Sequence, residues 1–171
     1  MEDMPPAIHE VVAYTGHLEV RGEVRAVPPR RLLDVLNTTQ TPYLTIENAA
    51  VMPLSRWGQS EPSAAQSVVL NKAEITFVWL IRESRVEVSE FVTVHKVPRQ
   101  VIAYFGPFVA EGTIHVIREY TLSQALDAIR EQFVAITSPS VVCLTVDGLT
   151  LKGGIVLCLN KERIVAVQER E

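Results

Sequence analysis

The sequence predicts a mainly β (α+β) protein made of two tandem, pseudo-symmetric, barrel-like repeats. The first observation is compositional. Hydrophobic residues make up 47% of the chain and are weighted toward Val, Ile and Leu, while 10 Pro and 8 Gly supply many turns. β-branched residues favour strands, and Gly and Pro mark the turns between them. The second observation is that one arrangement of residues occurs twice.

The repetition is clearest in two nearly identical phrases. "LNKAEITFV" at 70–78 returns as "LNKERIVAV" at 159–167, an offset of 89 (from 70 to 159). Upstream, "VVAYTGHLEVRGEV" at 11–24 lies over "VIAYFGPFVAEGTI" at 101–114, an offset of 90 (from 11 to 101). Chance does not readily give two glycines, the helix leucines and the LNK phrase in one order with a single-residue indel. We therefore predict a first repeat at 1–84 and a second at 98–171.

Residues 85–97 connect the two predicted repeats. Valines recur at every second position within this segment, at Val86 and Val88 and again at Val92 and Val94. This alternation indicates an extra strand, and the segment lacks the Gly/Ser-rich composition of a flexible linker. We therefore expect the repeats to pack together as one globular unit.

Each repeat is expected to open with two strands, at 9–15 and 18–27 in the first copy. Gly22 continues the alternating series inside the second strand, and Gly112 recurs at the same place in the second copy. A glycine within a strand usually marks a bulge or a sharp bend. Bent strands let a small sheet curl into a barrel.

One short helix should follow in each repeat. Leu32, Leu33 and Leu36 fall on one helical face, and Asn37 is a plausible stop. In the second copy Thr121 and Gln124 have the spacing of a capping box. They precede an apolar stripe formed by Leu122, Ala125, Leu126 and Ile129.

The remainder of each repeat should be β. "YLTIENAAVMPL" (43–54) and "FVAITSPSVVCL" (133–144) favour strand, turn, strand. Strands at 67–71 and 74–81 then flank an Asn-Lys turn, for which the left-handed conformation tolerated by Asn is suitable. The predicted order is β-β-α-β-β-β, twice.

The first repeat resembles the Sm-like small β-barrels. The resemblance is carried by the "G-x-x-x-V-x-G-x-V" pattern from Gly16, followed by "LDVLN", "LTIENAAV" and "VVLNKAEITFV". It implies RNA binding, by analogy of fold alone. The chain departs from the family pattern because its Asp34 and Asn37 fall on a helix, and the second repeat has Gln124 and Asp127 there. The pattern of Gly, "RLLDVLN" and a later Leu also resembles small uncharacterised bacterial proteins, a resemblance that implies no activity.

Charge and hydropathy limit the classes of partner. The net charge is −4 and the pI about 5.6, which argues against nucleic acid as the partner, because such binding relies on clustered Lys and Arg. No apolar run approaches the length of a membrane span, and the acidic N-terminus "MEDMPPAIHE" lacks a hydrophobic signal core. We expect a cytoplasmic protein with no membrane partner and with Cys143 and Cys158 as buried free thiols.

No catalytic or cofactor signature stands out. The histidines, His9, His17, His95 and His115, have no metal-ligand spacing, so we expect no metal site. No nucleophile motif is present, and Gly153–Gly154 precedes a strand where a phosphate loop would open a helix. We therefore expect no cofactor, and the sequence favours a protein that is not an enzyme.

Four residues are predicted to bind a partner. Arg30 and Arg31 stand at the start of the first helix, where they either form a solvated face or meet an anionic partner. Arg56 and Trp57 lie in the polar segment "SRWGQSEPSAAQS" (55–67), which has no matching Trp in the second repeat. A loop Trp either anchors to its own core or serves a partner, since Trp is enriched at binding hot spots.

These observations lead to one principal hypothesis of function. The chain is interpreted as a non-enzymatic binding or assembly module, with a protein partner or self-association through exposed sheet edges. Two alternatives stay open: RNA or nucleotide binding through an Sm-like surface, and an enzyme with its site at the repeat interface.

Overall fold

The computed structural model describes residues 5–27, 30–83 and 95–171. The first part of the chain contains six elements: β1 (Ala7–Thr15), β2 (Leu18–Ala26), α1 (Leu32–Asn37), β3 (Tyr43–Pro53), β4 (Ser63–Asn71) and β5 (Ile75–Glu83). The second part contains seven: β6 (Lys96–Phe105), β7 (Phe108–Ile117), α2 (Leu122–Ala128), β8 (Phe133–Cys143), β9 (Thr150–Leu151), β10 (Val156–Asn160) and β11 (Ala166–Glu169). Three 3₁₀ turns join strands: η1 (Leu54–Arg56), η2 (Lys72–Glu74) and η3 (Lys161–Arg163). The prediction of a mainly β fold is confirmed.

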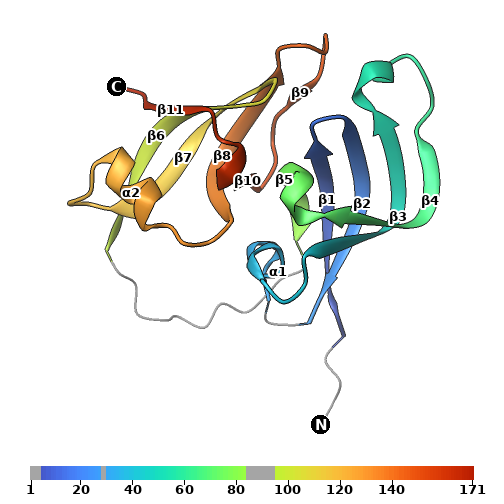
Figure 1. Ribbon diagram of the computed structural model, residues 1–171, viewed down its shortest axis with the longest axis horizontal. Helices are drawn as coiled ribbons and strands as arrows, with labels where there is room; N and C mark the ends of the chain where they lie inside the picture. Colours follow the sequence, from blue (N-terminus) through green and yellow to red (C-terminus); the bar gives the residue numbers. More distant parts are fainter. Residues whose placement is uncertain (1–4, 28–29, 84–94) are drawn as a thin grey trace.

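All the strands belong to one open antiparallel sheet (Figure 1). The strand order is β11-β6-β7-β8-β10-β5-β1-β2-β3-β4, with β9 paired to β8. The second part, at the left of Figure 1, meets the first part where β10 pairs with β5, from Val156 opposite Leu80 to Leu159 opposite Phe77.

The prediction of barrel-like repeats needs correction, because the sheet does not close. β5 uses one edge to pair with β1 and the other to pair with β10 of the second part. Among the described strands, this leaves β4 with β3 as its sole neighbour in the sheet. The predicted connecting strand at 85–97 lies outside the described residues up to position 94, and β6 begins at Lys96.

The two parts pair their strands in matching registers. Tyr14 lies opposite Phe77 across β1 and β5, and Tyr104 lies opposite Ala166 across β6 and β11. The β3–β4 and β8–β10 ladders match in the same way. Below, two residues are called counterparts when they differ by 90 positions, or by 89 from residue 67 of the first part onward.

A bulge interrupts the second strand of each part at its glycine. The pairing of β2 with β3 shifts register around Gly22, and that of β7 with β8 shifts around Gly112. A Cβ atom at Gly22 would lie 2.5 Å from the Glu47 carbonyl oxygen, and one at Gly112 would lie 3.0 Å from the Thr137 carbonyl oxygen. The predicted bend at both glycines is confirmed, because the neighbouring strand leaves no room for a side chain.

The strands opposite these glycines differ from the prediction. We expected a turn within 43–54 and within 133–144, but β3 and β8 are each continuous. Asn48 and Ser138 take φ values of 48° and 49° there. One residue in the left-handed region makes a bulge that bends the strand without ending it.

The LNK phrases connect a hairpin to the preceding helix in each part. Asn71 Oδ1 accepts a hydrogen bond from Ala73 N at 3.0 Å, and Asn160 Oδ1 accepts one from Glu162 N at 3.1 Å. The expected left-handed Asn is wrong, since Asn71 has φ −70° and instead caps η2 through its side chain. Lys72 Nζ donates to Val35 O at 2.8 Å and to Thr38 O at 3.1 Å, close to the end of α1.

The lysine of each phrase therefore satisfies carbonyl groups near the end of the helix. Lys161 Nζ donates likewise to Ile129 O, which directly follows α2. Lys72 is buried, and desolvation lowers the pKa of its ammonium group below the ordinary value. The predicted capping box of α2 is confirmed, because Thr121 Oγ1 accepts from Gln124 N at 3.2 Å while Thr121 N donates to Gln124 Oε1 at 2.9 Å.

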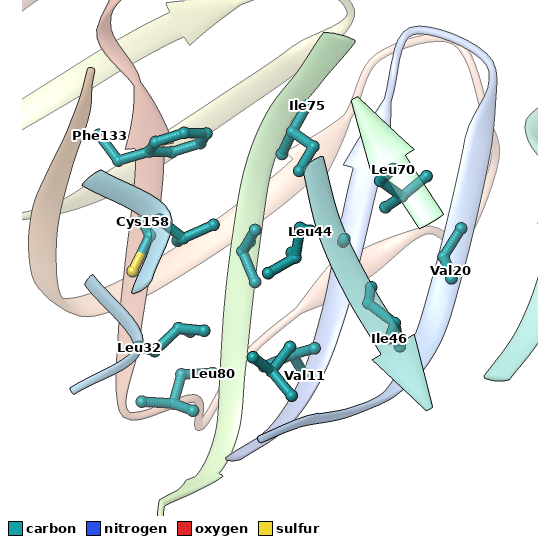
Figure 2. Packing of buried hydrophobic residues seen from close by; sticks show 14 of the residues in the cluster. Val11, Val20, Leu32, Leu44, Ile46, Leu70, Ile75, Leu80, Phe133 and Cys158 are labelled. Carbon is teal, nitrogen blue, oxygen red and sulfur yellow. The ribbon is translucent and has the colours of Figure 1, made fainter. Parts of the chain in front are cut away.

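Three clusters of buried side chains hold the sheet and helices together. The α1 core lies between α1 and the first part of the sheet, and it includes Phe133 and Cys158 of the second part beside Leu32 and Leu80 (Figure 2). The central core joins the opposite face of β1 and β5 to the second part, with Phe77 and Phe108 ring centroids 5.0 Å apart. The α2 cluster is smaller and consists of Val101, Ile114, Val116 and Ala125.

Candidate functional site

The four residues predicted to bind a partner fall into two separate places. Arg30 and Arg31 are exposed where the chain enters α1, and the backbone N–H of Arg31 donates to Asp34 Oδ2 at 2.9 Å. Arg56 ends η1 and is exposed, and Trp57 follows it half-buried. Arg30 and Trp57 line different grooves with no residue in common. The structure does not bring the two pairs together, and their role stays a prediction.

Trp57 is held by a buried carboxylate. Its indole Nε1 donates to Glu19 Oε2 at 3.1 Å, and Tyr14 Oη donates to the same oxygen at 2.7 Å. Arg21 Nε donates to Glu19 Oε1 at 3.0 Å. Burial, and then the nearby charge of Glu19, raise the pKa of Tyr14. Trp57 thus anchors the η1 segment to the first part of the sheet.

The sequence alone gave no sign that Glu19 is buried. It sits in an alternating strand next to charged Arg21, where a solvent-facing carboxylate is the ordinary expectation. Its environment depends on Trp57, which is 38 positions away along the chain. Tyr14 lies opposite Glu19 on the neighbouring strand, but this pairing alone does not indicate that the carboxylate is buried. The contact with Trp57 is needed as well.

Several grooves lie on the surface of the described residues, and three of them are near residues discussed above. The Trp57 groove, with a volume of about 590 Å³, is lined by Trp57, His17 and Asp147 among others. The hairpin groove, about 680 Å³, lies between the last residues of β4 and residues 162–165. The α1 groove, about 610 Å³, includes Arg30 and His115.

Arg163 and His115, two of the ionisable side chains that line these grooves, contact neighbouring groups. In the hairpin groove, Arg163 Nη2 lies 3.4 Å from Glu74 Oε2 and also donates to a backbone carbonyl. In the α1 groove, His115 Nε2 is 3.1 Å from Thr137 Oγ1, but the ion pairs within the described ranges give His115 no carboxylate to orient it. A nucleophile activated by a base needs such a third group.

Of the two strands at the ends of the described sheet, β4 is the longer, and no described strand lies beside its outer edge. β4 has nine residues, "SAAQSVVLN", without a charge or a proline, and most of its side chains are exposed. The opposite edge strand, β11, has four residues, and Arg170 and Glu171 follow it. Natural sheets protect edges by shortening them or by adding charge or proline. β11 is therefore a short edge followed by charges, whereas β4 is long and has none of these features.

The outer face beside the β4 edge exposes two large side chains. Tyr43 at the start of β3 is 58% exposed, and Val69 on β4 is 60% exposed. Their counterparts, Phe133 and Cys158, are 1% and 0% exposed because the first part of the chain covers them. We call Tyr43, Val69 and the free edge of β4 the β4 surface.

Exposed sheet edges were predicted from the sequence as pairing templates, but the β4 edge was not located. Residues 55–67 were predicted to be a polar loop, whereas β4 begins at Ser63. "SAAQS" lacks the β-branched and aromatic residues that predict strands. Pairing with β3 imposes the extended conformation on it, from Val51 opposite Ser63 onward.

The described residues contain neither a cluster of metal-ligand side chains nor a helix that could span a membrane. Within residues 5–27, 30–83 and 95–171, no three His, Cys, Asp or Glu side chains gather as metal ligands. Neither helix in the same ranges has the length and hydropathy needed to span a membrane. Both cysteines are free and buried, and burial raises the pKa of the Cys158 thiol to about 12. Comparisons with protein-family models, with curated proteins and with solved structures find no match to this chain.

Proposed function

We propose that the chain is a non-enzymatic assembly module, built from two copies of one β-β-α-β-β-β unit, which takes up a further β-strand on the β4 surface. The observation that carries the proposal is the contrast between two matching edges. The outer edge of β10 is covered by β5, while the outer edge of its counterpart β4 is long, uncharged and has no strand beside it within the described residues.

Two internal copies of one unit account for the matching registers of the two parts. The glycine bulges, the left-handed residues at 48 and 138 and the LNK hairpins recur at counterpart positions. A unit that pairs edge to edge inside the chain already has the shape needed to pair again outside it.

Strand addition suits the chemistry of the β4 surface. Unpaired N–H and C=O groups along an edge bind an incoming strand through main-chain hydrogen bonds, and exposed side chains on alternate positions add selectivity. Tyr43 and Val69 offer apolar area of this kind. β4 carries no charge, so it brings no like-charge repulsion against an incoming strand.

A matched pair of variants tests the proposal. Val69→Lys places a charge on the open edge, whereas Val142→Lys places the same charge on β8, which is flanked by β7 and β9. Val142 is also exposed, at 45%. Tagged wild type and both variants are used to capture partners from cell extract and to capture an untagged copy of the chain.

The proposal expects at least one partner that wild type and Val142→Lys retain and Val69→Lys loses. It is wrong if no capture depends on Val69. Circular dichroism of the three proteins shows whether each variant has kept the fold.

A further inference from the structure

The α1 core is completed by side chains from the other part of the chain. Phe133 and Cys158 belong to the second part, yet they pack with Leu32 of α1 and Leu80 of β5 (Figure 2). Val78 of β5 belongs to the same core. With them in place, Leu32 and Leu36 are each 1% exposed. The contact between the two parts therefore includes the packing of two side chains of the second part against α1 and β5 of the first.

The α2 cluster lacks this completion. Leu122 and Leu126, the counterparts of Leu32 and Leu36, are half-buried, as is Val167, the counterpart of Val78. All the described residues in this cluster or packed against it belong to the second part, so it receives no side chains from another part as the α1 core does from Phe133 and Cys158. The α2 cluster is an apolar surface of the same kind, left partly open.

The side chains that would complete it are present and exposed on the same chain. The counterparts of Phe133 and Cys158 are Tyr43 and Val69, the two exposed residues of the β4 surface. The sheet of one chain therefore has two complementary edges. The β4 surface at one edge exposes two side chains, and the α2 cluster near the other edge has no such pair packed against it.

We propose that the strand taken up by the β4 surface is β11 of a second copy of this chain, so that copies join head to tail. This inference rests on the proposed function and names its partner. Tyr43 and Val69 of one copy pack beneath α2 of the next and complete its cluster, as Phe133 and Cys158 do beneath α1. The contact repeats between chains the junction that each chain already makes internally.

The expected strand register follows from the internal junction. Cys158 lies opposite Val78 and Leu159 opposite Phe77 across β10 and β5. The counterpart pairs between two copies are Ser67 with Glu169, Val68 with Gln168, Val69 with Val167 and Leu70 with Ala166. None of these pairs brings like charges together, so the two edges are compatible in this register.

The internal junction contains a buried side-chain hydrogen bond, and the proposed contact between copies has a counterpart donor for it. Asn160 Nδ2 donates to Ile75 O at 2.9 Å, between β10 and the start of β5. Its counterpart Asn71 is exposed and uses its Oδ1 for the cap of η2. In the head-to-tail contact its Nδ2 is placed to donate to Ile164 O of the next copy.

One counterpart pair makes the contact between copies weaker than the internal junction. Asn37 accepts from Phe133 N at 2.8 Å and donates to Phe133 O at 3.0 Å, which ties α1 to β8. Its counterpart is Asp127, whose carboxylate can accept from Tyr43 N but cannot donate to Tyr43 O. β11 also offers Ala166 and Gln168 where β5 offers Phe77 and Trp79. Association should therefore be reversible and concentration-dependent.

A head-to-tail contact uses two different surfaces and leaves one of each free at the ends of a dimer. Further copies add in the same way, giving a ring if the rotation closes and a filament if it does not.

Mixed cross-linking tests the arrangement directly. A tagged Val69→Cys chain is mixed with an untagged Val167→Cys chain under mild oxidation, and each variant is also oxidised alone. Facing residues of an antiparallel pair are close enough for a disulfide. The expected result is a mixed dimer that forms at least ten times more than the Val69→Cys homodimer.

Two results would overturn the head-to-tail arrangement: a Val69→Cys homodimer that predominates, which indicates β4 paired with β4, or no cross-link at all with a monomeric wild type in sedimentation. In either case partner capture that depends on Val69 would leave the proposed function standing, and its loss would remove both.

Asp127→Asn provides a gain of association that a merely structural role would not give. Restoring the amide supplies the missing donor, so the dissociation constant measured by sedimentation should fall about 5-fold. Asp127→Ala is the matched control and should give no such gain. Equal association of Asp127→Asn and Asp127→Ala would contradict the predicted contact between α2 and Tyr43.

Discussion

The strands β10 and β4 occupy counterpart positions in the two parts of the chain but lie in different surroundings. Cys158 and Asn160 on β10, with Phe133 at the start of the neighbouring β8, are buried against the first part. Their counterparts face solvent: Val69 and Asn71 on β4, and Tyr43 at the start of the neighbouring β3. The local hairpin is the same in both places, so the difference comes from whether a strand is paired beside it. The comparison shows that the hairpin forms without a neighbour, while burial of its outer face requires one.

The largest expected effect separates Phe133 from Tyr43. Phe133→Ala removes a ring from the α1 core and should lower the free energy of unfolding by about 3–5 kcal/mol. Tyr43→Ala in dilute protein should change it by about 0.5 kcal/mol or less, because this ring is exposed. Urea unfolding followed by circular dichroism measures both. Similar losses for the two variants would show that Tyr43 is already covered in the isolated chain.

The two LNK asparagines give the next contrast. Asn160→Ala loses a cap and a buried donor, and leaves Ile75 O unsatisfied, at a cost of about 2 kcal/mol. Asn71→Ala loses the cap alone, at about 0.5–1 kcal/mol. The same unfolding experiment compares them at low concentration. A larger loss of unfolding free energy for Asn71→Ala than for Asn160→Ala would contradict the assignment of β10 as the paired edge and β4 as the open one.

Cys158 adds a pH dependence to the paired edge. Its thiol pKa is raised from 9.0 to about 12 by burial, so the folded protein holds a proton that the unfolded chain loses above pH 9. This contribution to stability is complete below pH 9 and is lost as the pH rises from 9 toward 12. At pH 10 the loss is about 1.4 kcal/mol.

Replacing the thiol isolates this contribution. Cys158→Ala should reduce the decline in unfolding free energy between pH 8 and pH 10 relative to wild type, after allowing for the fixed cost of the smaller side chain. Cys143→Ala is the control for loss of a thiol elsewhere in the sheet. Parallel pH profiles for wild type and Cys158→Ala would mean that Cys158 titrates as it does in the unfolded chain.

The smallest expected effect concerns Trp57, which has no Trp counterpart. Trp57→Phe removes the donor to Glu19 but leaves Tyr14 and Arg21 bound to that carboxylate. We expect a loss of about 1 kcal/mol in unfolding free energy and no change in self-association. Arg56→Ala, the exposed neighbour, should stay within about 0.5 kcal/mol. A loss of self-association in Trp57→Phe would move the interface from β4 to the Trp57 groove.

The sequence predicts local features well and the joining of the two parts poorly. The Thr121–Gln124 cap and the bends at Gly22 and Gly112 follow from short-range rules, and all three are observed. The pairing of β10 with β5 brings together strands about 80 positions apart, from Val156 opposite Leu80, and no local pattern specifies it. For the same reason the burial of Glu19 and the exposure of Val69 could not be predicted.

The central claim is that β4 is an open edge which pairs with β11 of a second copy. Amide hydrogen exchange of the wild type, measured in a dilute and in a concentrated sample, tests this claim most directly. In the dilute sample we expect fast exchange along β4 and slow exchange along β10, because one edge is open and the other is paired. In the concentrated sample β4 and β11 should gain protection together, while β2 and β7 should not change. Exchange along β4 that is slow at low concentration, or that fails to slow as concentration rises, would contradict the account.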